Sequence, residues 1–304
     1  MLIDSFENNI ATVTRPELLG FSNLCNLPLK KPSIMKYSIE CTNGEQTIVK
    51  VKDTLVGSPR IVLIAGPCSL ENEPQMWEAA LAAKVAGAVG LRGGAFKPRT
   101  SPYSFQGNGE TALIMQRKIA DELGMFVVTE ATGEKNLPSV AKYADIIQIG
   151  ARNSQNFELL SLAGEVAGKL GRAILYKRGP WMSINEWMLA TEYILASGCK
   201  DVILCERGTN LNDGGYGLDT QGIVSLRKIT HLPIIADPTH SAKKSDQVPQ
   251  IAINGIAAGA DGLIIEVHPN PQEAKSDGER ALLPQTLIAL SEEIRNNLPI
   301  GRQF

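Results

Sequence analysis

The sequence predicts an α/β protein, a closed (β/α)8 TIM barrel with a short N-terminal β-hairpin extension. Three observations support this fold. Short apolar β-branched runs recur about every 20 to 37 residues from residue 61 onward. The stretches between them have helical periodicity, as at Trp77, Ala80, Leu81, Lys84 and Val85. Each run is followed by a charged or reactive motif, as in barrel enzymes. An open doubly wound sheet is the alternative, because strand counts from sequence err by one or two.

The first 57 residues differ from the rest. Residues 37–41 and 46–51 are two β-prone runs on either side of Asn43-Gly44, a strong two-residue hairpin signal. Residues 27–33 (LPLKKPS) have the composition of an irregular linker. We therefore expect an N-terminal extension with a β-hairpin over residues 1–57 and a catalytic barrel over residues 58–304.

Eight apolar runs are predicted to be the barrel strands. Their apolarity is continuous rather than alternating, which suits strands buried on both faces. The runs are residues 61–64, 89–91, 126–128, 146–149, 173–176, 202–204, 233–235 and 263–265.

Composition excludes several classes of protein. The formal net charge of −2 gives no general attraction for nucleic acid or an anionic membrane. No apolar run approaches the roughly 18 residues that a membrane span needs, and the start of the chain lacks the features of a secretory signal. The five cysteines are scattered without a disulfide framework. We expect a cytoplasmic protein with reduced thiols.

Residues 92–107 carry a group of three cations. Arg92, Lys97 and Arg99 lie within eight residues, in a stretch with two prolines and three glycines that disfavour a helix. A basic loop at the carboxyl end of a strand can hold an anion. The alternative is a solvated basic surface loop.

Other strand ends repeat this feature. In a barrel they converge on one face, so their cations would form a ring that favours ligands with several negative charges, such as carboxylates and phosphates. The alternative is that some of these cations form structural salt bridges with Glu130, Glu206 and Asp237. The seven cations are Arg92, Lys97, Arg99, Arg152, Lys177, Arg178 and Arg207.

A second group of strand-end residues combines a thiol, an imidazole and carboxylates. Such a set suits Mn, Fe, Co or Zn rather than Mg or Ca. Taken singly, a buried cysteine is usually a packing residue and a lone histidine a hydrogen-bonding one. His268 is the rival imidazole, whereas His231 precedes the seventh strand and lies toward the wrong face. The candidate ligands are Cys68, His240, Glu266 and Asp277.

These motifs resemble the 3-deoxy-D-arabino-heptulosonate 7-phosphate (DAHP) synthase family, type I, in its shorter β-type branch. The resemblance covers residues 58–298 in unbroken order. It rests on IAGPCS, GGAFKPRTSPYSFQG, TEA, QIGARN, KRG, ILCERG, DPTHS and IIEVHPNP followed by SDG. It implies a (β/α)8 barrel that condenses phosphoenolpyruvate with erythrose 4-phosphate, the first step of the shikimate pathway to aromatic amino acids.

The resemblance also implies site residues. Cys68, His240, Glu266 and Asp277 would hold one divalent metal ion. Pro98, Arg99 and Thr100 would receive erythrose 4-phosphate. The catalytic residues would be Lys97, Cys68 and His240. Because Lys97 would lie between the substrates, it is a candidate proton donor to the developing alkoxide, and a metal-bound water is the alternative donor. The phosphoenolpyruvate site would consist of Arg92, Lys97, Glu130, Ala151, Arg152, Lys177 and Arg207.

Two segments depart from this family: Pro180-Trp181-Met182, and GTNLNDGGYGLDTQG after Arg207. The second leans toward 3-deoxy-D-manno-octulosonate 8-phosphate synthase, which uses arabinose 5-phosphate, although that enzyme has a different loop in place of K-P-R-T. Two further alternatives are a Schiff-base aldolase with Lys177 as nucleophile and a non-catalytic phosphate-binding barrel. The resemblance implies a homo-oligomer, either a tetramer or a dimer, and the first 57 residues predict no dedicated regulatory domain.

Overall fold

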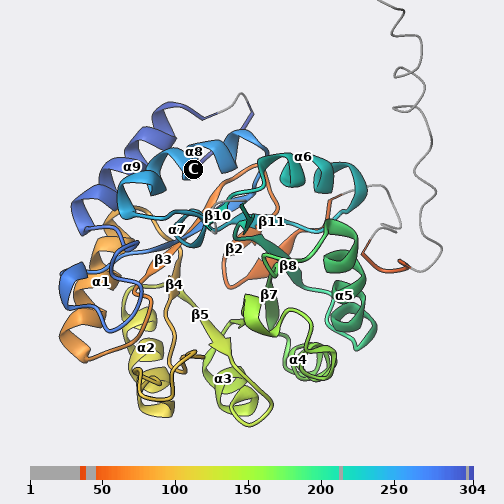
Figure 1. Cartoon of the computed structure of the whole chain (residues 1–304), viewed down its shortest axis with the longest axis horizontal. Coiled ribbons are helices and arrows are strands. Elements are labelled where there is room, and N and C mark those ends of the chain that lie inside the picture. The colour runs from red at the N-terminus through yellow and green to blue at the C-terminus, as the bar shows by residue number, and fades with distance from the viewer. Residues whose placement is uncertain (1–34, 39–45, 212–214, 299–300) are drawn as a thin grey trace, which may run out of the picture. The chain divides into compact units, whose positions relative to one another are not determined.

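A closed barrel of eight parallel strands is the centre of the fold (Figure 1). The computed structural model describes residues 35–38, 46–211, 215–298 and 301–304. Within them the strand order is β11-β12-β3-β4-β5-β6-β7-β8, and β11 closes the ring by pairing with β8. The predicted (β/α)8 barrel is confirmed, and each of the eight predicted runs contributes to one strand. The strands are β3 (Val62–Gly66), β4 (Gly90–Arg92), β5 (Phe126–Ala131), β6 (Ile146–Ile149), β7 (Ala173–Lys177), β8 (Val202–Glu206), β11 (Ile234–Ala236) and β12 (Gly262–Glu266).

Helices surround the barrel (Figure 1). Capping side chains fix where several of them begin: Asn72 accepts from the Gln75 N–H before α1, and Ser183 and Glu186 form a capping box at α5. No helix in the described ranges is both long and apolar enough to cross a membrane. The helices are α1 (Glu73–Val85), α2 (Glu110–Glu122), α3 (Leu137–Tyr143), α4 (Phe157–Leu170), α5 (Ile184–Ala196), α6 (Thr220–Ile229), the short α7 (Pro238–Ser241), α8 (Val248–Ala257) and α9 (Pro284–Asn296).

Large apolar side chains fill the inside of the barrel. Phe126 from β5 packs where Gly90 of β4 has no side chain, since a Cβ on Gly90 would lie 2.2 Å from the Phe126 ring. Val49 and Val56, which precede the barrel in the chain, belong to the same buried cluster. The barrel interior is therefore a packed core and not a channel, which leaves the strand ends to form the site.

The N-terminal hairpin that the structure describes uses part of one predicted run, residues 46–51, together with residues further along the chain. Strand β1 (Val49–Val51) pairs antiparallel with β2 (Thr54–Val56). The turn between them contains Lys52 at φ +50°. Tyr37 and Ser38 lie in a turn, while residues 39–45, and with them Asn43-Gly44, lie outside the described residues. The boundary predicted at residue 57 stays a prediction.

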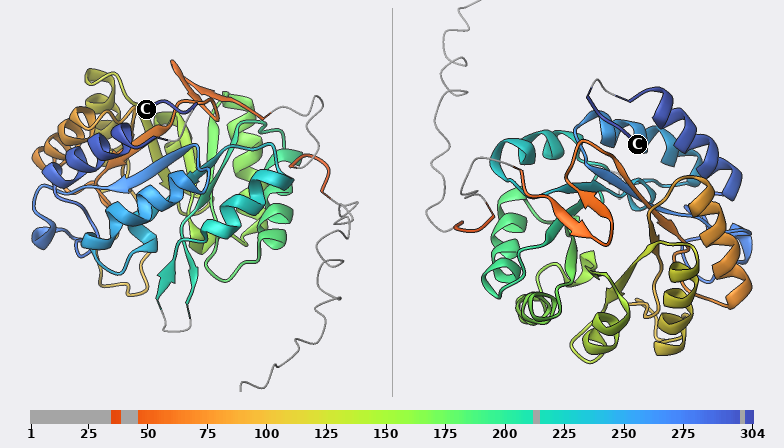
Figure 2. Two further views of the ribbon diagram at one scale, coloured as in Figure 1. Left: turned by 90° about the horizontal axis from the view of Figure 1, so that it is seen from above. Right: turned by 180° about the vertical axis from the view of Figure 1, so that it is seen from behind.

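Loops at the carboxyl ends of the strands carry the remaining elements. Strands β9 (Thr209–Asn210) and β10 (Tyr216–Gly217) form a small hairpin after β8, at the opposite end of the barrel from β1 and β2 (Figure 2). Residues 93–107 form no helix, as predicted. Three 3-10 turns complete these loops: η1 (Ala151–Asn153), η2 (Ser245–Gln247) and η3 (Pro271–Glu273).

Candidate functional site

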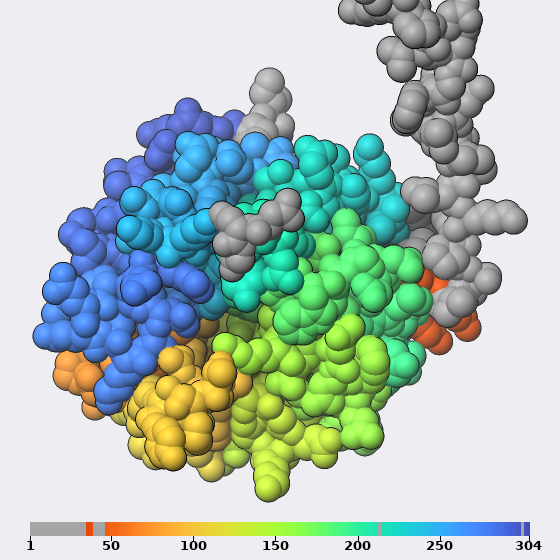
Figure 3. Space-filling model, viewed as in Figure 1, coloured from red at the N-terminus to blue at the C-terminus, as the bar shows by residue number. Residues whose placement is uncertain are grey.

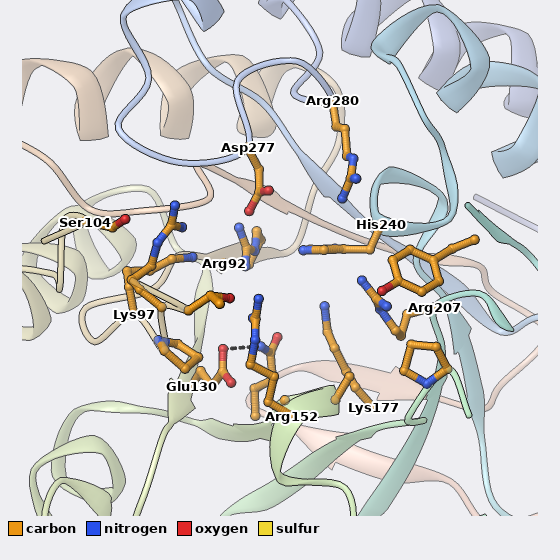
Figure 4. A pocket seen from close by; sticks show the side chains of 18 of the residues that line it. Arg92, Lys97, Ser104, Glu130, Arg152, Lys177, Arg207, His240, Asp277 and Arg280 are labelled. Carbon is orange, nitrogen blue, oxygen red and sulfur yellow. Dashed lines mark hydrogen bonds between the residues drawn. The ribbon is translucent and has the colours of Figure 1, made fainter. Parts of the chain in front are cut away.

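A pocket of about 530 Å³ lies at the carboxyl ends of the barrel strands (Figure 4). The molecular surface on this side has a hollow near its centre (Figure 3). The ten residues predicted to bind substrates all line the pocket, although they come from five separate loops or strand ends. They are Arg92, Lys97, Pro98, Arg99, Thr100, Glu130, Ala151, Arg152, Lys177 and Arg207.

The candidate metal ligands gather at one side of this pocket. One ligand atom each from Cys68, Glu266 and Asp277 lies within 4.8 Å of the others, which marks a possible metal site. His240, the fourth predicted ligand, lines the pocket and has its Nε2 atom 3.5 Å from Glu266 Oε1. Its other ring nitrogen, Nδ1, is 2.7 Å from Asp237 Oδ2. A carboxylate on the far nitrogen is the usual way in which proteins orient a metal-binding imidazole.

The donor atoms fit a divalent cation. Glu266 Oε2 is buried and, within the described residues, has no hydrogen-bond partner, whereas Oε1 accepts from Arg92 at 2.9 Å. A buried carboxylate oxygen without a partner is costly unless something positive satisfies it. Thiol, imidazole and carboxylate donors together suit a borderline transition metal.

Two of these candidate ligands have shifted pKa values. Burial raises the pKa of the Cys68 thiol to about 12, and the Glu266 carboxylate adds to this effect. The thiol is therefore protonated at neutral pH, and Sγ donates to Asp277 Oδ2 at 3.1 Å. Burial opposes ionisation of Asp277, but His240, Cys68 and other neighbours lower the pKa of its carboxyl to about 2. Asp277 also adopts φ +50°, an uncommon backbone conformation that aspartate tolerates better than most residues.

The pocket contains paired and unpaired cations. Arg92 pairs with Glu266, and Lys177 Nζ lies 2.5 Å from Asp237 Oδ2. Lys97 Nζ donates to both the carbonyl oxygen and Sγ of Cys68 at 3.0 Å, so it connects the K-P-R-T loop to the candidate metal ligands. Across the described parts of the chain, five pocket cations form no ion pair with a carboxylate: Lys97, Arg99, Arg152, Arg207 and Arg280.

The prediction that Arg178 belongs to the ring of cations is wrong. Arg178 does not line the pocket. Its guanidinium bonds Glu206 and Asp219 at 2.9 Å and the carbonyl oxygen of Met182 at 2.8 and 2.9 Å. These partners neutralise the charge of Arg178. The side chain therefore has a structural role: it links the end of β7 to Glu206 at the end of β8 and to Asp219, the residue before α6.

The other two histidines do not enter the pocket. His231 contacts Thr47 Oγ1 and the Tyr37 carbonyl oxygen, on the far side of the barrel as predicted. His268, the rival imidazole, is buried and accepts a hydrogen bond from the Asn270 N–H through Nδ1. Cys199 is buried with a free thiol.

Several pocket residues were not identified from the sequence. Arg280 lies three residues after Asp277 of the SDG motif. Its closeness in sequence to a candidate metal ligand was the only sign that it lies near the site. Trp181 and Tyr216 belong to the two segments that depart from the family pattern, so their unusual composition was a signal too. The further lining residues are Ser101, Ser104, Gln148, Gly150 and Pro180.

Comparison with known proteins identifies relatives along most of the chain. Phospho-2-dehydro-3-deoxyheptonate aldolase of Thermotoga maritima is 47% identical over 253 residues, which cover 83% of this chain and 74% of the relative. The 2-dehydro-3-deoxyphosphooctonate aldolase of Fusobacterium nucleatum is 33% identical over 245 residues, covering 74% of this chain and 86% of the relative.

Solved structures agree with the sequence comparison. The crystal structure of the Thermotoga maritima DAHP synthase superposes with a TM-score of 0.83 at 43% identity, over 90% of this chain and 82% of that one. A truncated form of the same enzyme gives a TM-score of 0.79 at 41% identity, over 86% and 96% of the two chains. A family model described as the DAHP synthetase I family matches residues 43–298. The chain therefore belongs to the DAHP synthetase I family.

Proposed function

We propose that this chain condenses phosphoenolpyruvate with erythrose 4-phosphate to give 3-deoxy-D-arabino-heptulosonate 7-phosphate and inorganic phosphate. The observation that carries the proposal is the cationic pocket beside the group of Cys68, Glu266 and Asp277, in a chain that belongs to this enzyme family. In this reaction C3 of phosphoenolpyruvate attacks the aldehyde carbon. Water then adds at C2, and phosphate leaves as the C2–O bond breaks. This is the entry step of the shikimate pathway.

Phosphoenolpyruvate would occupy the deep part of the pocket. It carries a carboxylate and a phosphate, and fixed guanidinium and ammonium groups can hold both in one orientation. Arg92 and Lys177 each already pair with a carboxylate. They would therefore orient the substrate by hydrogen bonding more than they would neutralise its negative charge. Lys97, Arg152 and Arg207 would balance most of the substrate's charge. Glu130 and Ala151 complete the proposed set.

The acceptor aldehyde would lie against the K-P-R-T loop. Arg99 and Thr100 line the pocket, and Arg99 has no ion-pair partner among the described residues, so both are available to an incoming phosphate. Pro98 would contact the carbon chain. Lys97 lies between the loop and the metal group and could pass a proton to the oxygen that becomes an alkoxide.

One divalent ion, Mn, Fe, Co or Zn, would be held by Cys68, His240, Glu266 and Asp277. When bound, it would polarise the aldehyde oxygen and so make the aldehyde a better electrophile for the weakly nucleophilic C3. The protein's own part is to keep these four side chains together and to aim His240 through Asp237.

Two alternative mechanisms are less well supported. A Schiff-base aldolase needs a free lysine amine as its nucleophile, but Lys177 Nζ is engaged by the Asp237 carboxylate at 2.5 Å. A non-catalytic barrel does not require a thiol, an imidazole and two carboxylates beside the pocket. Arabinose 5-phosphate is the alternative acceptor. It has less support, because the phosphooctonate aldolase of Fusobacterium nucleatum is 33% identical to this chain and the heptonate enzyme of Thermotoga maritima is 47% identical.

Product analysis tests the proposal. The chain is stripped of metal, Mn is restored, and phosphoenolpyruvate labelled with oxygen-18 in its bridging ester oxygen is supplied with erythrose 4-phosphate. We expect a seven-carbon sugar phosphate by mass spectrometry and one labelled phosphate for each product, since the C2–O bond breaks. Unlabelled phosphate, or no sugar product, would contradict the proposed chemistry.

We also propose a cytoplasmic homo-oligomer, either a tetramer or a dimer. The three described cysteines are free and buried, which suits a reducing compartment. The oligomer is carried over from the family resemblance. Sedimentation equilibrium of the full chain would measure its mass, and a monomer at micromolar concentration would refute the oligomer.

A further inference from the structure

A buried carboxylate outside the pocket lies against the segments that carry the metal ligands. Glu71 follows Cys68 by three residues, and its side chain is only 5% exposed. Burying a carboxylate is costly unless neighbouring groups satisfy it. The residues that approach Glu71 therefore indicate what its charge holds in place.

Within the described residues, the side-chain contacts of Glu71 all involve one oxygen, Oε1. The Lys275 N–H donates to it at 2.8 Å, and the Ser69 hydroxyl donates to it at 3.2 Å. His268 Nε2 lies 3.8 Å away. Lys275 precedes Asp277 by two residues, Ser69 follows Cys68, and His268 follows Glu266 by two residues. One oxygen therefore contacts the three chain segments that supply Cys68, Glu266 and Asp277.

Two further observations strengthen this connection. Ser69 Oγ also lies 2.6 Å from Ser276 Oγ, beside Asp277. Because His268 Nδ1 accepts from the Asn270 N–H, its Nε2 carries the hydrogen in the neutral ring. That Nε2 atom is buried, and the described residues offer it no hydrogen-bond partner. The Glu71 carboxylate oxygen Oε1 lies 3.8 Å from this atom.

The same segment is also tied to the substrate loop. Asn108 Nδ2 donates to the carbonyl oxygens of Leu70 and Glu71 at 2.8 and 2.9 Å. Gln75 fixes the segment from the other side, with its Nε2 donating to the Ser69 carbonyl oxygen at 3.1 Å. The Glu71 backbone is therefore held independently of its carboxylate. Loss of the carboxylate alone should loosen the loop that carries Asp277 more than the segment that carries Cys68.

We propose that Glu71 is a positioning residue that sets the spacing of Cys68, Glu266 and Asp277 and thereby the affinity of the site for a divalent ion. It touches neither substrate nor metal. Its charge accepts the Lys275 N–H and faces the His268 ring, so Asp277 keeps its uncommon backbone conformation with the carboxylate directed at Cys68. This inference rests on the metal site of the proposed function.

The test is a titration of the metal-free full chain with Co²⁺, followed by the absorption band that a thiolate–cobalt bond produces. For Glu71→Gln we expect affinity about 10- to 100-fold weaker than that of the unsubstituted chain, the usual cost of losing a group that orients a ligand. Glu71→Asp keeps the charge on a shorter side chain, so its cobalt affinity should lie between that of Glu71→Gln and that of the unsubstituted chain. Phosphoenolpyruvate binding, measured by calorimetry without metal, and the melting temperature should change little.

The matched control is Glu73→Gln, two residues away. Glu73 forms an exposed ion pair with Lys118, in which the two side chains are 50% and 60% exposed, so cobalt affinity should stay unchanged. Unchanged cobalt affinity in Glu71→Gln would overturn the inference. So would a joint fall in cobalt affinity, phosphoenolpyruvate affinity and melting temperature, because that would indicate a general structural role.

Failure of the metal site itself gives a different result. If the unsubstituted chain shows no thiolate–cobalt band, or if the band persists in Cys68→Ser, the proposed metal site is wrong and this inference is overturned with it. A strong band in the unsubstituted chain and in Glu71→Gln alike would overturn only the role of Glu71.

Discussion

At the scale of single residues, the cations of the pocket fall into two groups, those that pair with a carboxylate and those that do not. Arg92 and Lys177 each face a carboxylate, whereas Arg99 and Arg152 have no ion pair among the described residues. An unpaired guanidinium in a partly enclosed pocket gains most from an anionic ligand. The unpaired cations should therefore determine substrate affinity directly.

Arg99→Gln tests this separation. We expect the KM for erythrose 4-phosphate to rise by roughly 10- to 100-fold, since one charge-assisted hydrogen bond is worth about 1.5–3 kcal/mol. The KM for phosphoenolpyruvate should stay nearly constant in steady-state kinetics. Lys142→Gln, whose side chain is 65% exposed, is the control. A rise in the KM for phosphoenolpyruvate alone would show that Arg99 belongs to the other substrate.

Gly150 shows how closely the backbone approaches the site. A Cβ at this position would lie 1.9 Å from Glu130 Oε1, so Gly150→Ala must displace the Glu130 side chain. We expect kcat/KM for phosphoenolpyruvate to fall by about 100-fold, because a displacement of about 1 Å in a catalytic site can cost that much. Gly133→Ala is the matched control, since its Cβ would meet nothing within 4 Å. Equal activity of the two variants would remove Glu130 from the site.

At the scale of elements, the small hairpin of β9 and β10 supports one pocket cation. The ring of Tyr216 lies 4.9 Å from the Arg207 guanidinium. A cation–π contact of this kind is worth about 0.5–2 kcal/mol. Tyr216→Ala should therefore raise the KM for phosphoenolpyruvate by roughly 2- to 30-fold. Tyr216→Phe keeps the ring and should behave like the unsubstituted chain, and an equal loss in both variants would point to the hydroxyl instead.

The hairpin of β1 and β2 has a different purpose, which is to contribute to the buried core of the barrel. Val56 is fully buried, whereas Leu55 on the other face of the same strand is 45% exposed. Val56→Ala should lower the free energy of unfolding by about 2 kcal/mol in urea titrations. Leu55→Ala should change it by less than about 0.5 kcal/mol. Similar losses in both variants would show that the hairpin is not anchored through Val56.

The barrel strands were predictable because each is buried on both faces, and β6 and β7, for example, are wholly buried. The hairpin was less predictable. Asn43-Gly44, the turn signal on which the prediction rested, lies outside the described residues. The described hairpin turns at Lys52, where no glycine or proline marks the turn, and the buried residues Val51 and Val56 lie on either side of it. Burial of these valines, rather than a local turn signal, marks this hairpin.

The site was only partly predictable for a similar reason. Residues at strand ends, such as Lys177 and Glu266, are placed by the barrel itself once the strands are known. Arg280 and Tyr216 lie further along loops whose path depends on packing, so sequence position alone did not place them in the pocket. Arg178 follows directly after a strand, but its partners Glu206 and Asp219 hold it away from the pocket.

At the scale of the whole molecule, the formal net charge is −2, but the pocket is strongly cationic. The pocket brings together residues from β4 to the loop after β12, so no single segment carries the function. Substrate selection and metal dependence should therefore both be properties of the closed barrel and not of one loop.

The most direct test of the account is the rate of phosphate release from phosphoenolpyruvate by the metal-stripped full chain, before and after Mn is restored. Erythrose 4-phosphate and arabinose 5-phosphate are offered in parallel, and kcat/KM is compared. The account predicts no turnover without metal, and with Mn a higher kcat/KM for the four-carbon sugar. Turnover that does not depend on metal, or a preference for arabinose 5-phosphate, would contradict it.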